Sequence, residues 1–112
     1  GLIMGYAIYS EDGSCLYWSY NSDSGENIDG LSDVKGEVLV SSKIPVEILN
    51  NGEYTIDIIA GIYSKEWLLK PQHDAPRIKI EVVGNLSNSV YYVDKRPTLL
   101  SPPIGWRIEK SL

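Results

Sequence analysis

Apolar and polar side chains alternate residue by residue along most of the chain, and this period of two is what most limits its possible folds. The alternation is clearest in YTIDIIAGIY, residues 54–63, and it recurs in 5–10, 15–20, 77–84 and 90–94. Successive side chains of a β-strand point to opposite faces, whereas a helix requires a period of 3.6. Residues 37–49 also resemble a strand, with Pro45 forcing an edge position or a break. Turn sequences separate these segments, so we predict an all-β antiparallel β-sandwich.

Alternation also assigns side chains to faces. In 54–63, we expect the core row to comprise Tyr54, Ile56, Ile58, Ala60 and Ile62. The opposite row, which includes Asp57, Ile59 and Tyr63, then points away from that core. In 77–84, we expect Ile78, Ile80 and Val82 in the core and Arg77, Lys79 and Glu81 in solvent.

The first two strands form a hairpin around Asp12-Gly13, a turn signal. A two-residue loop places Ser10 opposite Cys15, Tyr9 opposite Leu16, Ile8 opposite Tyr17 and Ala7 opposite Trp18. Directly opposed residues share a face. Tyr6, Ile8 and Tyr17 are therefore expected on one face, and Tyr9, Leu16, Trp18 and Tyr20 on the other. A bulged three-residue loop is the alternative, and it shifts this register by one residue.

Aromatic residues off the core face are the main functional signal. The chain has eight Tyr, three Trp and no Phe, a bias towards rings that carry a polar group and suit half-exposed surfaces. Such rings stack against the apolar face of a sugar, while nearby polar groups bind its hydroxyls. The candidate carbohydrate-binding residues are Tyr9, Trp18, Tyr20, Asp57, Tyr63 and Trp67. The alternative is that these rings pack under a loop, a missing strand or a neighbouring subunit.

Charge and cysteine content exclude several classes of function. The net charge is −5, with Lys and Arg dispersed, so we expect no nucleic-acid partner. Cys15 is the single cysteine, which excludes an internal disulfide and fits a reducing compartment. The sequence shows no signal peptide and no apolar run near the roughly 18 residues that span a bilayer.

Catalytic and metal-binding signals are weak. His73 and Asp74 are adjacent in a predicted loop, where a local hydrogen bond is the more common role for such a pair. Acidic residues in 23–33 lack EF-hand spacing, so we predict no metal site, no cofactor and no enzyme. The remaining enzymatic alternative is a glycoside hydrolase, which needs two carboxylates about 5–10 Å apart in a pocket.

The chain begins at Gly1 inside an apolar stretch, and we expect a single domain cut from a longer protein. Residues 1–94 form the sandwich core, and residues 95–112 form a proline-rich arm of the same domain. Pro97, Pro102 and Pro103 favour an extended arm, and 105–109 then adds as a strand to an edge of this chain or of a partner. Trp106 anchors that contact, or else packs within its own chain.

Four motifs resemble the C-terminal domain of Wzt-type proteins, the ATP-binding subunits of ABC exporters for O-antigen and related polysaccharides. They are GYAIYSEDG, IPVEILNNGEYTIDI, HDAPRIKIEV and KRPTLLSPPIGW. The resemblance covers about residues 5–106. Its more specific parts are the Asn-Gly-Glu-Tyr entry into the central strand and the tail containing Arg96, Leu100 and Trp106.

The resemblance implies an Ig-like or jelly-roll-like sandwich that follows a nucleotide-binding domain at the cytoplasmic face of the bacterial inner membrane. Such domains bind the terminus of a lipid-linked polysaccharide and admit it for export through a membrane permease. They form homodimers in which the C-terminal strand is exchanged, which makes Arg96, Leu100 and Trp106 candidate interface residues. The family has a further strand before the first one seen here. We therefore expect a non-catalytic carbohydrate-binding domain; the alternative is a dimerisation or protein-interaction domain that binds no glycan.

Overall fold

The computed structural model describes residues 2–23, 36–37, 39–62, 65–83 and 96–110. Its strands are β1 (Leu2–Ser10), β2 (Cys15–Tyr20), β3 (Gly52–Ile62), β4 (Glu66–Leu69) and β5 (Arg77–Val82), with one short 3-10 helix, η1 (Val46–Ile48). All strand pairs are antiparallel. The predicted all-β class is therefore confirmed.

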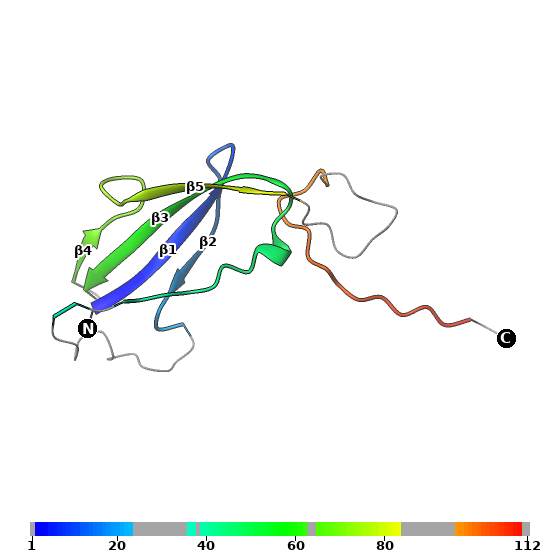
Figure 1. Cartoon of the computed structure of the whole chain (residues 1–112), viewed down its shortest axis with the longest axis horizontal. Coiled ribbons are helices and arrows are strands. Elements are labelled where there is room, and N and C mark those ends of the chain that lie inside the picture. The colour runs from blue at the N-terminus through cyan, green and yellow to red at the C-terminus, as the bar shows by residue number, and fades with distance from the viewer. Residues whose placement is uncertain (1, 24–35, 38, 63–64, 84–95, 111–112) are drawn as a thin grey trace.

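The strands form a single sheet with the order β2-β1-β3 (Figure 1). Beyond β3 the sheet divides, because β4 pairs with residues 60–62 of β3 whereas β5 pairs with residues 52–57. The part of the chain that the structure describes contains no second sheet. The predicted strand at 90–94 lies outside the described residues, and so does the acidic loop from 24 to 33.

The first hairpin differs from the prediction at its turn. The Ser10 amide donates to the Ser14 carbonyl at 2.8 Å, so three residues, and not two, form the loop. Gly13 has a φ of +89°, a left-handed conformation that glycine adopts without steric cost. A bulge then pairs Tyr9 with Cys15 and restores the predicted partners, Ile8 with Tyr17 and Ala7 with Trp18.

The bulge changes the position of one side chain. Leu16 was expected beside Trp18, yet it packs with Tyr17 against the cluster that contains Tyr6 and Ile8. The extra residue of a β-bulge interrupts strict alternation, so two consecutive side chains contribute to the same core.

The core lies on one face of the sheet, here called the core face. Its buried residues are Tyr6, Ile8, Leu49, Tyr54, Ile56 and Val82, with Leu16, Tyr17, Ile44, Ile48 and Ile80 packed against them. Ile78 was predicted to belong to this core, but it is 52% exposed. Ile78 instead lines an open hollow between the sheet and the segment that contains Val40 and Ile44.

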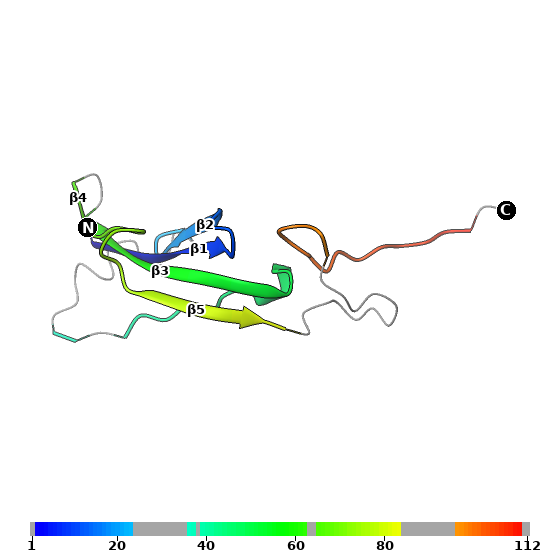
Figure 2. The same cartoon turned by 90° about the horizontal axis from the view of Figure 1, so that it is seen from above.

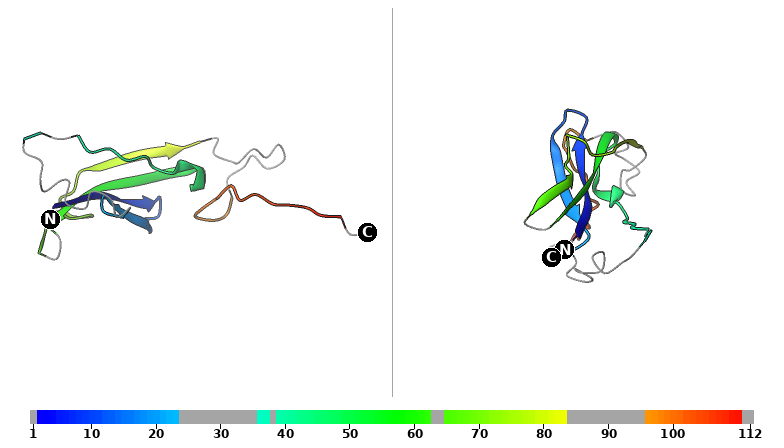
Figure 3. Two further views of the ribbon diagram at one scale, coloured as in Figure 1. Left: turned by 90° about the horizontal axis from the view of Figure 1, so that it is seen from below. Right: turned by 90° about the vertical axis from the view of Figure 1, so that its left-hand side faces the viewer.

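Residues 39–49 cover the core face without forming the predicted strand (Figures 2 and 3). Pro45 has a fixed φ and no N–H, so it cannot take part in a continuous β-ladder. Instead it starts η1, and its carbonyl accepts a hydrogen bond from the Ile48 amide at 3.2 Å. The break that proline imposes is confirmed, but the strand on either side of it is absent among these residues.

The opposite face of the sheet is also partly buried. Ala7, Tyr9 and Ile59 form a second cluster, with exposures of 0, 5 and 1%. The row predicted to face away from the core thus contains a buried isoleucine. Tyr54, Ile56 and Ala60 of the predicted core row are buried as expected, whereas Ile58 and Ile62 are not among the buried core residues.

The base of the C-terminal arm is fixed to the end of the sheet by Asn50, which is 1% exposed. The Asn50 amide donates to the carbonyls of Arg96 and Thr98, and its oxygen accepts from the Arg96 amide at 3.1 Å. Leu100 forms an isolated bridge with Leu49, and Ser101 donates to the carbonyls of Ile48 and Leu49. After residue 101, the arm extends away from the sheet (Figure 1).

Candidate functional site

The face opposite the core face carries Tyr9, Trp18, Tyr20 and Trp67, and is here called the aromatic face. Trp18 lies on β2 and Trp67 on β4, with β1 and β3 between them in the sheet. Three interstrand spacings amount to roughly 14 Å, yet the two indole centroids are only 5.7 Å apart, at 84°. The side chains therefore lean towards each other over the two central strands.

Small residues below the rings permit this approach. Ala7 is paired with Trp18, and Gly61 is paired with Trp67. A Cβ atom at Gly61 would lie 3.1 Å from the Glu66 carbonyl oxygen and 3.8 Å from the Trp67 ring. Tyr20 extends the row, with its ring centroid 6.3 Å from that of Trp18 and an edge-to-face angle of 86°.

The two indoles are held in place yet remain accessible. Trp18 and Trp67 are each 43% exposed, which is unusual for side chains with such large apolar surfaces. Edge-to-face contacts fix the relative orientation of the rings and leave parts of their π-faces open. The arrangement thus provides a rigid apolar platform, and burial of this platform by a ligand is favourable.

A pocket of about 440 Å³ opens beside the platform, within the usual size range of small-molecule sites. Ile3, Ile59 and Gly61 supply apolar lining, and Tyr20 and Trp67 connect the pocket to the rings. Its polar lining residues are Ser22, Lys65 and Glu66. Lys65 lies in the turn between β3 and β4, where its amide donates to the Ile62 carbonyl at 2.9 Å.

The polar residues after Tyr20 form a turn at the edge of the aromatic face. The Tyr20 amide donates to Asp23 Oδ2 at 2.9 Å, and Asn21 Oδ1 accepts from the Met4 amide at 2.9 Å. Partial burial raises the pKa of Tyr20, with a further contribution from the Asp23 charge. The turn therefore fixes the end of β2 to β1 and places Ser22 at the pocket.

Tyr9 lies on the predicted face but is 5% exposed, so its ring is not available for stacking. Burial raises its pKa, and a hydrogen bond from Trp18 acts in the opposite direction. Tyr9 therefore packs beneath the aromatic face with Ala7 and Ile59, in the cluster against which Tyr20 lies. The expectation that Tyr9 contacts a ligand is corrected to a supporting role.

Asp57 also requires correction, because it is 1% exposed and its oxygens are already used. Arg77 donates from Nε to Oδ1 at 2.7 Å and from Nη2 to Oδ2 at 2.9 Å, and the Gln72 amide donates to Oδ2 at 2.9 Å. Hydrogen bonds from Arg77 lower the pKa of Asp57 despite its burial, and Asp57 raises the pKa of Arg77. Asp57 is thus a structural anion, whereas the Arg77 side chain is 49% exposed.

Arg77 is the residue that sequence reasoning missed. It was expected to point to solvent, and alternation alone could not reveal that β5 pairs with β3 in the register that places Arg77 opposite Asp57. Tyr63, another predicted contact, lies outside the described residues. Trp18, Tyr20 and Trp67 are brought together as predicted.

The predicted interface residues of the arm behave differently from one another. Arg96 and Leu100 belong to its anchored base, whereas Trp106 is 90% exposed. The alternative that Trp106 packs within its own chain is therefore wrong. Its proposed role between subunits stays a prediction.

The remaining sequence signals have structural explanations. Asp74 Oδ1 accepts from the Lys70 amide at 3.1 Å, and the His73 amide donates to the Lys70 carbonyl, so this pair closes a turn. Within the described ranges, no three His, Cys, Asp or Glu side chains cluster as metal ligands would. No helix in the same ranges has the length and apolar character needed to cross a bilayer.

Comparison with known protein families, curated proteins and solved structures found no match to this chain.

Proposed function

We propose that this chain is a non-catalytic carbohydrate-binding domain whose ligand stacks on Trp18 and Trp67. The observation that supports the proposal most directly is the edge-to-face pair of half-exposed indoles next to a 440 Å³ pocket. An indole offers a broad apolar surface that fits the C–H face of a pyranose ring. Ser22, Lys65 and Glu66 at the pocket supply groups that can hydrogen-bond to the hydroxyls.

The proposed ligand is the terminus of a lipid-linked cell-surface polysaccharide of the O-antigen type. This part of the proposal is based on the resemblance of the sequence motifs to Wzt-type proteins. In that setting the domain would belong to a protein that also carries a nucleotide-binding domain, at the cytoplasmic face of the bacterial inner membrane. It would deliver the polysaccharide to the membrane permease of an ABC exporter and catalyse no reaction itself.

The test compares single-indole variants in a glycan-retention assay. Trp18→Ala and Trp67→Ala are expected to abolish retention on the polysaccharides that the parent chain binds. The thermal midpoint should change little, because both side chains are already 43% exposed. Trp106→Ala is the matched control: it removes the same side chain from a position far more exposed and away from the platform, and it should retain full binding. Equal retention by all three variants would show that the platform is not the site.

A second candidate function is dimerisation without glycan binding, and the composition of the arm favours it. Ile104, Trp106 and Ile108 alternate along an extended segment and are 68, 90 and 91% exposed. Exposed apolar rows of this kind mark interaction surfaces. Truncation after Ser101 keeps the anchored base and removes this row, so sedimentation of the truncated chain as a monomer would support an arm-mediated homodimer. If no glycan is retained while the dimer forms, dimerisation alone is the function.

A further inference from the structure

Four residues on four adjacent strands form one transverse row of the sheet, which runs across the aromatic face. Trp18 on β2 pairs with Ala7 on β1, Ala7 with Asp57 on β3, and Asp57 with Arg77 on β5. Directly opposed residues share a face, so Arg77 lies on the same side of the sheet as the indole platform. The two central residues are fully or almost fully buried, which leaves Trp18 and Arg77 as the accessible ends of the row.

The guanidinium of Arg77 is oriented and only partly used. Of its five N–H groups, one on Nε and one on Nη2 donate to Asp57 at 2.7 and 2.9 Å, which leaves three for other acceptors. Its side chain is 49% exposed. Asp57 is itself fixed by the Gln72 amide, in a turn where Gln72 has a φ of +66°. A bidentate pair with a buried carboxylate restricts rotation of the guanidinium.

We propose that Arg77 is the specificity-determining residue of the aromatic face, and that it donates hydrogen bonds to adjacent hydroxyls of a neutral hexose in an oligosaccharide that also stacks on Trp18. This inference rests on the proposed function. The backbones at the two ends of the row are separated by roughly 14 Å at the usual interstrand spacing, and both end side chains lean inwards, Trp18 towards Trp67 and Arg77 onto Asp57. A ligand that contacts both therefore lies across the two central strands. Stacking on an indole contributes affinity for many different sugars. The fixed N–H donors of the guanidinium, in contrast, distinguish sugars by the arrangement of their hydroxyl groups.

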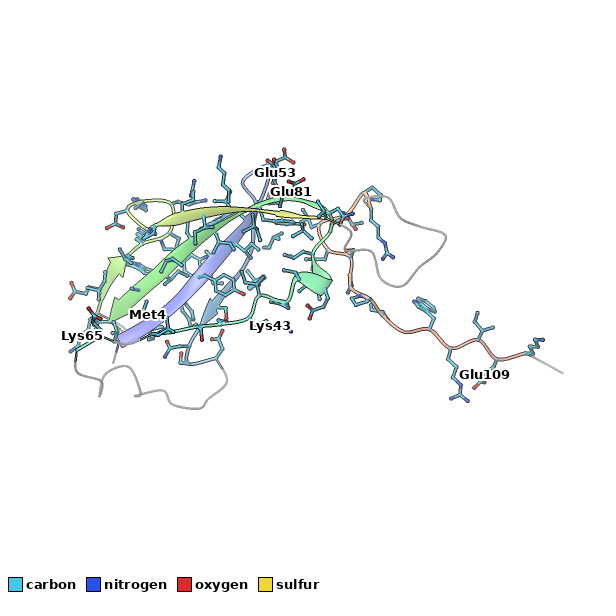
Figure 4. All side chains as sticks on the ribbon, viewed as in Figure 1. Met4, Lys43, Glu53, Lys65, Glu81 and Glu109 are labelled. Carbon is cyan, nitrogen blue, oxygen red and sulfur yellow. The ribbon has the colours of Figure 1, made fainter. Side chains whose placement is uncertain are left out.

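The charges around Arg77 favour a neutral ligand over an acidic one. Asp57 is ionised and balances the guanidinium. Lys79 follows on the same face of β5, but Glu81 comes next and pairs with Glu53, and these two carboxylates lie side by side (Figure 4). The sequence also carries a net charge of −5. An acidic glycan would therefore meet no excess of positive charge at this end of the row.

The experiment measures affinity for immobilised hexasaccharides of mannose, galactose and glucose, with a hexasaccharide of galacturonic acid as the acidic comparison. Arg77→Lys retains the charge but loses the fork, and it should weaken binding to the best neutral probe about tenfold, as expected for one lost hydrogen bond to a charged group. Lys79→Gln removes a charge two residues away on the same face and should leave the affinity unchanged. Binding by the parent chain should also be nearly independent of salt, because no net charge is neutralised.

The outcomes separate this inference from the proposed function. Unchanged affinity of Arg77→Lys, alongside loss of binding by Trp18→Ala, overturns the role of Arg77 alone. Equal losses in Arg77→Lys and Lys79→Gln, or preference for the acidic probe, overturn neutral recognition. Retention on none of these probes overturns the recognition of a neutral hexose by Arg77, whereas the proposed function falls only if the O-antigen-type polysaccharide is not retained either. If Arg77→Lys does not fold, the Arg77 Nε–H resonance of the unmodified protein is followed during titration with the best neutral probe: a shift supports the contact, and a constant position contradicts it.

Discussion

The hydroxyl groups of Tyr6 and Tyr17 lie 2.6 Å apart, and their rings meet edge to face with centroids separated by 5.6 Å. These side chains come from β1 and β2 and close one margin of the core face. Burial raises the pKa of Tyr17, and its hydrogen bond to Tyr6 adds to the effect. The next residue along the chain, Trp18, points to the opposite face. Two consecutive aromatic residues thus serve different purposes.

This division predicts opposite results for conservative changes at neighbouring positions. Tyr17→Phe should lower the free energy of unfolding by about 1 kcal/mol, because Tyr6 loses its partner in a partly buried site, and should leave glycan retention unchanged. Trp18→Phe should leave stability nearly unchanged and weaken retention. Urea unfolding and the glycan assay, applied to both variants, check the pair of results. Reversed effects would place Tyr17 on the binding face.

The sequence predicts β1, β2, β3 and β5 because their alternation is strong, whereas β4 lacks such alternation and is not predicted. One local irregularity also limits the assignment of faces. The three-residue turn alone would have shifted the whole hairpin by one position, yet the bulge at Leu16 compensates for it. A bulge depends on the fit of two strands in space and has no signal within a single strand. The sequence therefore predicts the face of Trp18 correctly, whereas the two-residue length that it suggests for the turn is wrong.

Other differences arise from pairings that are distant in the sequence. Nothing near Asp57 in the sequence indicates that Arg77, 20 residues later, satisfies its charge. In the same way, residues 37–49 have strand-like composition, but Pro45 starts a 3-10 helix instead, and Ile44, Ile48 and Leu49 pack against the core face. Local patterns predict the character of an element, whereas burial and ion pairing depend on which elements become neighbours.

The buried side chain of Asn50 leads to a prediction about the arm. Asn50→Ala removes its two hydrogen bonds to the carbonyls of Arg96 and Thr98, and should cost about 1–3 kcal/mol of unfolding free energy because buried polar groups lose their partners. The Arg96 amide also loses Asn50 Oδ1 as its acceptor, so its hydrogen should exchange faster with solvent. Thr98→Ala is the control, since the Thr98 backbone carbonyl still accepts from Asn50 and only an exposed side-chain bond is lost. Equal costs for the two variants would refute the anchoring role.

The close approach at Gly61 leads to a prediction about the platform. Gly61→Ala places a methyl group 3.1 Å from the Glu66 carbonyl, so β4 must move away and carry Trp67 with it. We expect weaker glycan retention and an altered tryptophan fluorescence maximum. Gly13→Ala is the control, because it makes the same substitution at a position where the added methyl group meets no neighbour. It strains a backbone φ of +89° and should lower the free energy of unfolding by roughly 1 kcal/mol. The fluorescence maximum should not change. Identical spectra for Gly61→Ala and the parent chain would argue against the steric constraint.

The ion pair between Asp57 and Arg77 makes stability dependent on acid. Hydrogen bonds from Arg77 lower the pKa of Asp57 in the folded state below 3.8, the ordinary value for this carboxyl. As the pH falls, the unfolded chain therefore takes up a proton on this group before the folded chain does. The contribution of the pair to stability is fully present above the unfolded pKa and is lost as the pH falls through the folded pKa.

Asp57→Asn tests this dependence, because the amide cannot titrate. Its unfolding free energy should be lower than that of the parent chain at neutral pH, and the difference should shrink as the pH falls towards about 2, where the parent carboxyl is protonated in the unfolded chain. Urea unfolding at a series of pH values measures both curves. A difference that stays constant with pH would show that Asp57 does not supply the acid dependence.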